Sequence, residues 1–339
     1  MPTRPRPYIL VVNGRKVRQP VFVIGAPHSG ADLLTRTLKR TPGFHFTVGQ
    51  PSVLSVVYAF ARAPSISEGR GQAAAKVLRD AFAQAWQVTA HACLTCSPEC
   101  QGAVTRPAAG TCVDERAIRR YGDASPALIY CAEGLVDAFP DARIVQIVRD
   151  GRAVVAAMLS DPQELAWFRR GVANLDSEFP NPLFGVETEE DRAAWPALSA
   201  AGKSAMRWRG AVHKMARLRN SLSADQLTTF RYEQVITEPQ ATAIALAAFI
   251  DGNLPKIEVP HGQKNPESWR RQLSPAQLAE IEKVAGQQLR RVGYGGYRNA
   301  GGYPAMARRE CRRSWFSRFS AAMISGKWLN ACGLLPTWR

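Results

Sequence analysis

A short loop near the start of the chain has the composition of a phosphate-binding turn. Residues 21–24 are apolar, and Gly25 is followed by Ala-Pro-His-Ser-Gly. A buried strand that ends in such a loop and continues as a helix aims backbone N–H groups and the positive end of the helix dipole at one point, where a phosphate needs no side chain. The loop carries His28 where a fixed cation is expected, and Asp32 where a small hydroxyl would serve best. Because the Walker spacing is missing, an ordinary tight turn remains the alternative.

Arg149 stands at the end of a second apolar run, residues 143–148. An arginine at the carboxyl end of a parallel strand faces the ligand crevice of an α/β sheet. Its guanidinium fork suits a phosphate, whereas a structural ion pair with a nearby acid is the alternative. Arg152, three residues further on, is expected to be a solvated helix residue.

Four of the seven cysteines lie close together, with the spacing C-x₂-C-x₃-C-x₁₁-C. They are Cys93, Cys96, Cys100 and Cys112. Four thiolates could hold a structural zinc ion and fix an insertion that has no core of its own. Disulfides and free thiols are the alternatives, although the odd number of cysteines argues against a disulfide scaffold.

The elements that must position these residues alternate between strands and helices. Short apolar runs predict strands at residues 21–25, 44–48, 143–148 and 227–232. Helical patterns are found at residues 31–40, 72–92, 125–139, 150–159, 204–222, 237–250 and 274–293. Ser274 and Gln277 form a capping box at the start of the last helix. The alternation predicts an α/β fold, a parallel sheet flanked by helices in a single domain, with a Cys-rich insertion at about 91–116.

Two long motifs resemble those of the sulfotransferases that use 3′-phosphoadenosine 5′-phosphosulfate (PAPS). Residues 20–34, PVFVIGAPHSGADLL, are similar to the family pattern P-[VI]-F-[VI]-x-G-x-P-R-S-G-T-[TS]-L-L. Residues 139–158, FPDARIVQIVRDGRAVVAAM, follow the second family motif nearly throughout. Later landmarks, including YGDASP at 121–126, occur in the family's order. The resemblance covers residues 20–298 and leaves a basic N-terminal segment, 1–19, and a basic aromatic extension, 299–339.

The resemblance implies a P-loop-like fold and a donor site for PAPS. The first loop would hold the 5′-phosphosulfate, through Pro27, His28, Ser29, Gly30, Ala31, Asp32 and Leu33. Arg149 would hold the 3′-phosphate together with position 157. Lys264 or Arg270 would contact the donor from a region that closes over the nucleotide in relatives, with a solvated loop as the alternative. A base would take a proton from the acceptor while the sulfuryl group passes in line, so catalysis would depend on positioning and charge stabilisation.

Several residues depart from the family pattern where the family does its chemistry. The substituted positions are His28 for a basic residue, Ala31 and Asp32 for hydroxyl residues, Gln50 for a glutamate base, Ala124 for a lysine and Ala157 for a serine. His28 and Gln50 are the catalytic candidates that remain. The expected function is transfer of a sulfuryl group from PAPS to a hydroxyl or amine of a small-molecule, glycan or natural-product acceptor. The alternative is a sulfotransferase fold that has lost donor use, and either catalyses another reaction on a natural product or only binds a ligand.

The net charge of +16 at first suggests a nucleic-acid partner. Much of it lies at the ends, however, because residues 1–20 hold five basic and no acidic residues, and residues 306–339 hold seven basic and one acidic residue. What remains suits a small anionic ligand, and no nucleic-acid-binding motif is found. No signal peptide is recognised, so a cytoplasmic enzyme is expected, with peripheral membrane contact through the C-terminal extension as a second interpretation. The sequence does not indicate an oligomeric state.

Overall fold

A computed structural model of the chain describes residues 9–67, 72–88, 113–169, 171–260 and 265–295. The four clustered cysteines, Lys264 and the C-terminal extension lie outside these residues, so the zinc, loop and membrane predictions stay predictions. The chain divides into two units, residues 1–285 and 286–339. The first unit contains the sheet and the loops discussed below. Among the described residues, none of the helices combines the length and apolar composition that a bilayer crossing requires.

The first unit is built on a five-stranded sheet in the order β4-β5-β3-β6-β7. The strands are β3 (Val21–Gly25), β4 (Phe44–Thr47), β5 (Arg120–Asp123), β6 (Arg143–Val148) and β7 (Leu227–Arg231). All neighbouring strands run parallel, which confirms the α/β fold class. A separate antiparallel pair joins β1 (Val11–Val12) to β2 (Arg15–Lys16).

Both faces of the central strand are buried, as its continuous apolar run predicts. Val21 and Val23 face a core built with the apolar side chains of α1, α11 and α12. Phe22 points the other way, with its ring centroid 5.1 Å from that of Phe82 and 5.3 Å from that of Phe139, on α4 and next to α6. The sheet is therefore a middle layer between two layers of helices.

The helices mostly follow the predicted periodicity. Their bounds are α1 (Ala31–Lys39), α2 (Pro51–Arg62), α3 (Pro64–Ser67), α4 (Gln72–Ala85), α6 (Ala132–Ala138), α7 (Gly151–Leu159), α8 (Pro162–Ala166), α9 (Glu189–Ala194), α10 (Ala200–Ser221), α11 (Tyr232–Thr237), α12 (Pro239–Ile250), α13 (Trp269–Gln272) and α14 (Pro275–Arg291). The capping box of α14 is confirmed, because the Gln277 amide donates to Ser274 Oγ and the Ser274 amide donates to Gln277 Oε1. The helix predicted over 125–139 is instead a 3₁₀ turn, Leu128–Cys131, followed by α6.

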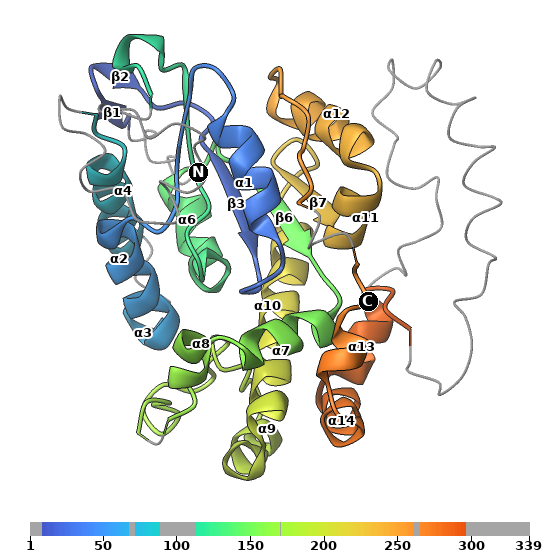
Figure 1. Cartoon of the computed structure of the whole chain (residues 1–339). Helices are drawn as coiled ribbons and strands as arrows, with labels where there is room; N and C mark the ends of the chain where they lie inside the picture. The colour runs from blue at the N-terminus through green and yellow to red at the C-terminus, as the bar shows by residue number, and fades with distance from the viewer. Residues whose placement is uncertain (1–8, 68–71, 89–112, 170, 261–264, 296–339) are drawn as a thin grey trace. The chain divides into compact units, whose positions relative to one another are not determined.

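The parallel strands deliver their carboxyl ends to one edge of the sheet. In Figure 1, β3, β6 and β7 lie next to one another, and α7 and α8 lie across the arrowhead ends of β3 and β6. The loop of the first motif follows β3, Arg149 follows β6, and Tyr232 follows β7 as the first residue of α11. Ligands of open α/β sheets bind at such an edge, so the candidate site is expected there.

Candidate functional site

The loop between β3 and α1 is a tight turn held by its own backbone. The Ser29 amide donates to the Ala26 carbonyl at 3.1 Å, and the Leu33 amide donates to the Gly30 carbonyl at 3.3 Å. His28 and Gly30 both adopt left-handed backbone conformations, with φ of 61° and 87°. A histidine in this conformation is uncommon, and such residues concentrate at functional sites. The loop delivers the His28 side chain to the surface while Ser29 stays buried.

Glycine is required at position 30 by space as well as by conformation. A Cβ atom added there would lie 2.1 Å from Cδ2 of the Tyr232 ring. Replacing Gly30 by alanine is therefore expected to lower the free energy of unfolding by at least about 2 kcal/mol, from left-handed strain and overpacking together. Urea unfolding would measure the loss. Gly171→Ala is the matched control, since Gly171 has φ of 80° but nothing within 4 Å of the added Cβ, so its cost should be the conformational strain alone. Equal losses in the two variants would contradict the role of the Tyr232 contact.

Arg149 connects the second motif to the first loop. It follows β6 directly, and its Nη1 donates to the backbone carbonyl of His28 at 3.0 Å. Its guanidinium lies 4.2 Å from the centroid of the Tyr232 ring, a cation–π contact. Burial is the largest effect on the Tyr232 hydroxyl and raises its pKa above the ordinary value, although the Arg149 charge lowers it. The hydroxyl therefore keeps its proton at physiological pH. The ends of β3, β6 and β7 thus meet at one place.

Two buried polar atoms at this place have no hydrogen-bond partner among the described residues. They are Ser29 Oγ and Arg149 Nε. Buried polar groups in folded proteins are nearly always paired, so orphaned ones need an explanation. A hydroxyl and a guanidinium N–H that await an acceptor are consistent with a site for an anionic ligand.

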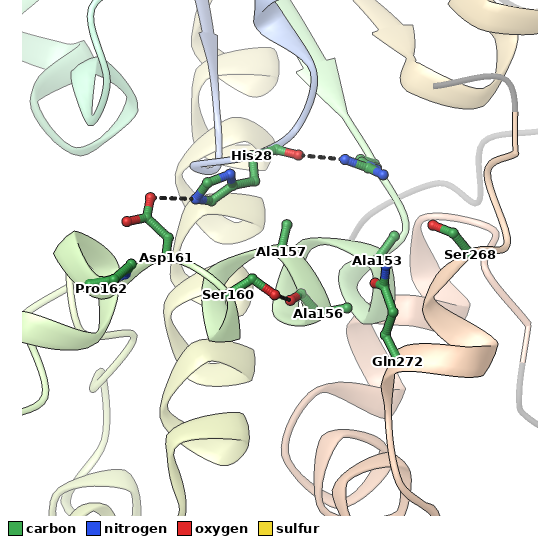
Figure 2. Close-up of a pocket in the computed structure, with 10 residues that line it drawn as sticks. His28, Ala153, Ala156, Ala157, Ser160, Asp161, Pro162, Ser268 and Gln272 are labelled. Carbon is green, nitrogen blue, oxygen red and sulfur yellow. Dashed lines mark hydrogen bonds and ion pairs between the residues drawn. The ribbon is translucent and has the colours of Figure 1, made fainter. Parts of the chain in front are cut away.

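A pocket of about 500 Å³ opens beside this loop. Its lining residues are His28, Arg149, Ala153, Ala156, Ala157, Ser160, Asp161, Pro162, Ser268 and Gln272. Figure 2 shows Asp161 beside the His28 ring. The carbonyl oxygen of His28 accepts the hydrogen bond from Arg149. A second pocket of about 290 Å³ shares His28, Arg149 and Ser268, and it adds Gly30, Asp32, Tyr232 and Asn265. The volume of each is in or near the range of small-ligand sites.

The residues that depart from the family pattern differ in whether they line these pockets. Ala157 lines the larger pocket and Asp32 the smaller one. The Asp32 side chain is 43% exposed, and its carboxylate lies 3.8 Å from Arg36 one turn along α1. Gln50 is the buried residue that precedes α2, and it is not among the residues that line either pocket. Asp32 and Ala157 thus line the two pockets, whereas the catalytic role of Gln50 stays a prediction.

Arg152 is not a solvated helix residue, and that prediction is wrong. Only 3% of it is exposed, its Nη2 lies 2.7 Å from the Asp150 carboxylate, and its guanidinium lies 4.4 Å from the Trp269 ring centroid. The Asp150 carboxylate also accepts the Arg152 amide and so caps the start of α7. The pair fixes the helix that forms one wall of the larger pocket.

Two acidic residues that the sequence did not single out lie beside His28. Asp161 and Glu164, from the start of α8, place carboxylate oxygens within 4.8 Å of one another and of an imidazole nitrogen. A metal ion could use such atoms. Each of the three side chains already has an ion-pair partner, however, because His28 pairs with Asp161 and Glu164 pairs with Arg207. An aspartate followed by proline, as at 161–162, is a helix-start signal that could have placed Asp161 at a loop end.

No curated protein sequence matches the chain. Among solved structures, a sulfotransferase from Alicyclobacillus acidocaldarius is 16% identical and covers 80% of this chain and 96% of its own, with a TM-score of 0.38. The sulfotransferase domain from the curacin biosynthetic pathway is 12% identical, covers 80% of this chain and 98% of its own, and has a TM-score of 0.41. Mouse sulfotransferase SULT7A1, complexed with PAP, is 10% identical and covers 84% of this chain and 88% of its own, with a TM-score of 0.36.

The sequence profile of the Sulfotransferase family matches residues 20–255. This range includes all five strands of the sheet, the first loop and Arg149. Because the match covers more than half of the chain, the protein belongs to the sulfotransferase family and is a transferase enzyme.

Proposed function

We propose that the enzyme transfers the sulfuryl group of PAPS to a hydroxyl or amine of a small-molecule, glycan or natural-product acceptor. One observation supports this most directly. Arg149 donates a hydrogen bond to His28 of the first loop, and both residues line both pockets. PAPS carries phosphate groups at both ends of its ribose, and two anion-binding elements at adjacent strand ends suit such a ligand.

In this proposal each element has a defined task. The backbone and Ser29 hydroxyl of the first loop would bind the 5′-phosphosulfate, and the Arg149 guanidinium would bind the 3′-phosphate. Ala157 has no hydroxyl to add, so Arg149 would carry more of the 3′-phosphate binding than a site with a serine requires. Lys264, whose neighbours Asn265 and Ser268 line the smaller pocket, remains a proposed contact from the closing loop.

Calorimetric titration with 3′,5′-adenosine bisphosphate (PAP), the desulfated product, tests the donor assignment. Binding in the micromolar range is expected, and adenosine 5′-monophosphate should bind at least about 10-fold more weakly because it lacks the 3′-phosphate that Arg149 would pair. Equal affinity for the two nucleotides would contradict the proposed contact between Arg149 and the 3′-phosphate. If neither nucleotide binds, the proposal fails and the family fold serves another reaction or ligand in this chain.

Replacing Asp32 by threonine is expected to strengthen PAP binding. The Asp32 carboxylate lines the smaller pocket together with Arg149, and there it repels an anion. Because the side chain is 43% exposed and faces Arg36, solvent and the neighbouring cation weaken this repulsion, so the expected gain in affinity is about 3- to 10-fold. Calorimetry at two salt concentrations would measure it, since the gain should shrink at high salt.

The matched control for this substitution is Asp80→Thr. Asp80 pairs with Lys76 in the same i, i+4 arrangement on an exposed helix face, away from both pockets. Its substitution should leave PAP affinity unchanged. A gain in both variants would show a general effect of net charge, and a loss of affinity in Asp32→Thr would mean that the carboxylate supports the site.

A further inference from the structure

The His28–Asp161 pair is a feature that neither the family motifs nor the donor site explains. Nε2 of His28 lies 3.2 Å from Oδ2 of Asp161, and each side chain is 31% exposed. Both residues line the larger pocket (Figure 2). The pair is therefore accessible to a ligand in that pocket.

Each member of the pair is fixed from its own side of the pocket. The second oxygen of Asp161, Oδ1, accepts the Gln163 amide at 2.9 Å and caps α8. The His28 backbone is fixed by its left-handed conformation and by the hydrogen bond from Arg149 to its carbonyl. An imidazole whose position is determined at both ends loses little freedom when it reacts, which is what a positioned acid–base group requires.

Among the titratable and charged groups around the pair, His28 is the one that offers a proton-accepting atom. Glu164 is engaged by the fully buried Arg207, and Arg149 donates to the loop backbone. Tyr58, whose pKa is raised by burial and by the nearby Glu164 carboxylate, keeps its proton. When His28 is neutral, donation of its Nε2 proton to Asp161 leaves Nδ1 unprotonated, on the side of the ring away from Asp161 (Figure 2).

We propose that His28 is the general base of the sulfuryl transfer and that Asp161 is the positioning residue that selects its reactive tautomer. The inference rests on the proposed function. In the transfer step, Nδ1 of His28 takes the proton of the acceptor O–H or N–H as the acceptor atom forms its bond to sulfur. The bond between sulfur and the bridging oxygen breaks, and its electron pair leaves with the 5′-phosphate of PAP. The imidazolium is stabilised by the Asp161 carboxylate and later returns its proton to solvent.

The pair gives the chain an acid–base group at a site where Gln50 cannot supply one. An amide side chain does not accept a proton near neutral pH, and the buried Gln50 is not among the residues that line the pocket. The same loop position that binds the phosphosulfate would then also hold the base. The two roles are compatible because the loop binds anions through its backbone, whereas the base acts through the imidazole ring.

The test compares Asp161→Asn with the unmodified enzyme. Asparagine retains an oxygen that can cap α8, so folding should be preserved, and thermal unfolding would verify this. Release of PAP from PAPS, the product formed with every acceptor, is measured with water and with a panel of phenols, alcohols and amines as acceptors. The expected result is a fall in kcat of about 100-fold or more, with a change in PAP affinity of less than about 3-fold. Asp161→Glu should recover part of the rate.

Chemical rescue provides the second measurement. His28→Ala should lose the rate to a similar extent, and added imidazole should restore part of it, which a merely structural role for the ring would not predict. The matched control is Glu187→Gln, which disrupts the His213–Glu187 pair of a half-buried histidine and a carboxylate outside the pocket. That variant should keep the unmodified rate.

Three results would overturn the proposal. The first is an Asp161→Asn rate within 3-fold of the unmodified enzyme. The second is an equal loss of PAP affinity and rate, which would assign the pair to donor binding. The third is an enzyme that binds PAP but forms no PAP from PAPS above the uncatalysed rate with any of these acceptors. An enzyme that fails to bind PAP at all refutes the donor assignment instead, so the two failures are distinguishable.

Discussion

Replacing Arg149 by alanine is expected to weaken PAP binding by about 100-fold. The guanidinium is the cation that the structure joins to the first loop, and its Nε has no partner among the described residues. A hydrogen bond to a charged group contributes about 1.5–3 kcal/mol, equivalent to about 10- to 150-fold in affinity. The substitution also removes the bond to the His28 carbonyl, so the larger part of that range is expected. Calorimetric titration of both proteins measures the change.

Two further variants show whether the loss belongs to this guanidinium. Arg149→Lys keeps the charge but not the fork, so its affinity should lie between those of the alanine variant and the unmodified enzyme. Arg192→Ala removes a half-exposed arginine outside both pockets and should leave the affinity unchanged. An Arg149→Ala protein that binds PAP as tightly as the unmodified enzyme would contradict the proposed 3′-phosphate contact.

Replacing Arg207 by methionine is expected to lower the free energy of unfolding by about 3–5 kcal/mol. The Arg207 side chain is fully buried, and its partner Glu164 is only 10% exposed. Removal of one member of a buried ion pair leaves the other charge uncompensated in a poor solvent for charge. Burial raises the pKa of the neighbouring Tyr130 to about 12, so its hydroxyl stays neutral and supplies no charge to balance the Glu164 carboxylate. Urea unfolding would give the difference.

The double variant Glu164→Gln with Arg207→Met separates charge from packing. If the uncompensated carboxylate causes the loss, removing that charge should recover most of the stability. Lys76→Met at the exposed Lys76–Asp80 pair is the control, with an expected change below about 1 kcal/mol. A double variant as unstable as the single one would show that the packing of the arginine side chain, whose guanidinium lies against the Trp167 and Tyr130 rings, is what matters.

Four of the five strands of the sheet were predicted, from short and mainly apolar runs. β3 and β6 have the bounds that their sequences indicate, because a strand buried on both faces has no polar alternation to confuse the pattern. β5 was missed because its sequence is Arg-Tyr-Gly-Asp. Its Asp123 is completely buried, with its carboxylate accepting from the Thr47 hydroxyl and the Ser125 amide. A tertiary network stabilises that strand, and no local pattern reports it.

The loop and Arg149 of the proposed donor site could be predicted, whereas the proposed acid–base pair could not. A loop after a buried strand and an arginine after its neighbour reach the same sheet edge whenever the strands are parallel, so local signals sufficed for the loop and Arg149. The position of Asp161 depends on how the chain turns from α7 into α8. Residues 160–203 have few periodic signals, so nothing in the sequence indicated that this carboxylate returns to His28. Arg152 was misjudged for the same reason, since its burial depends on Trp269, more than a hundred residues away.

Tyr232 ties the position of Gly30 to that of Arg149. Its ring occupies the space in which a Cβ of residue 30 would lie, and Arg149 stacks on the same ring. A single aromatic side chain at the end of β7 therefore contacts residues that follow β3 and β6. In the proposed donor site, a smaller side chain at position 232 would loosen the loop and the guanidinium together, so a substitution outside both motifs would affect both.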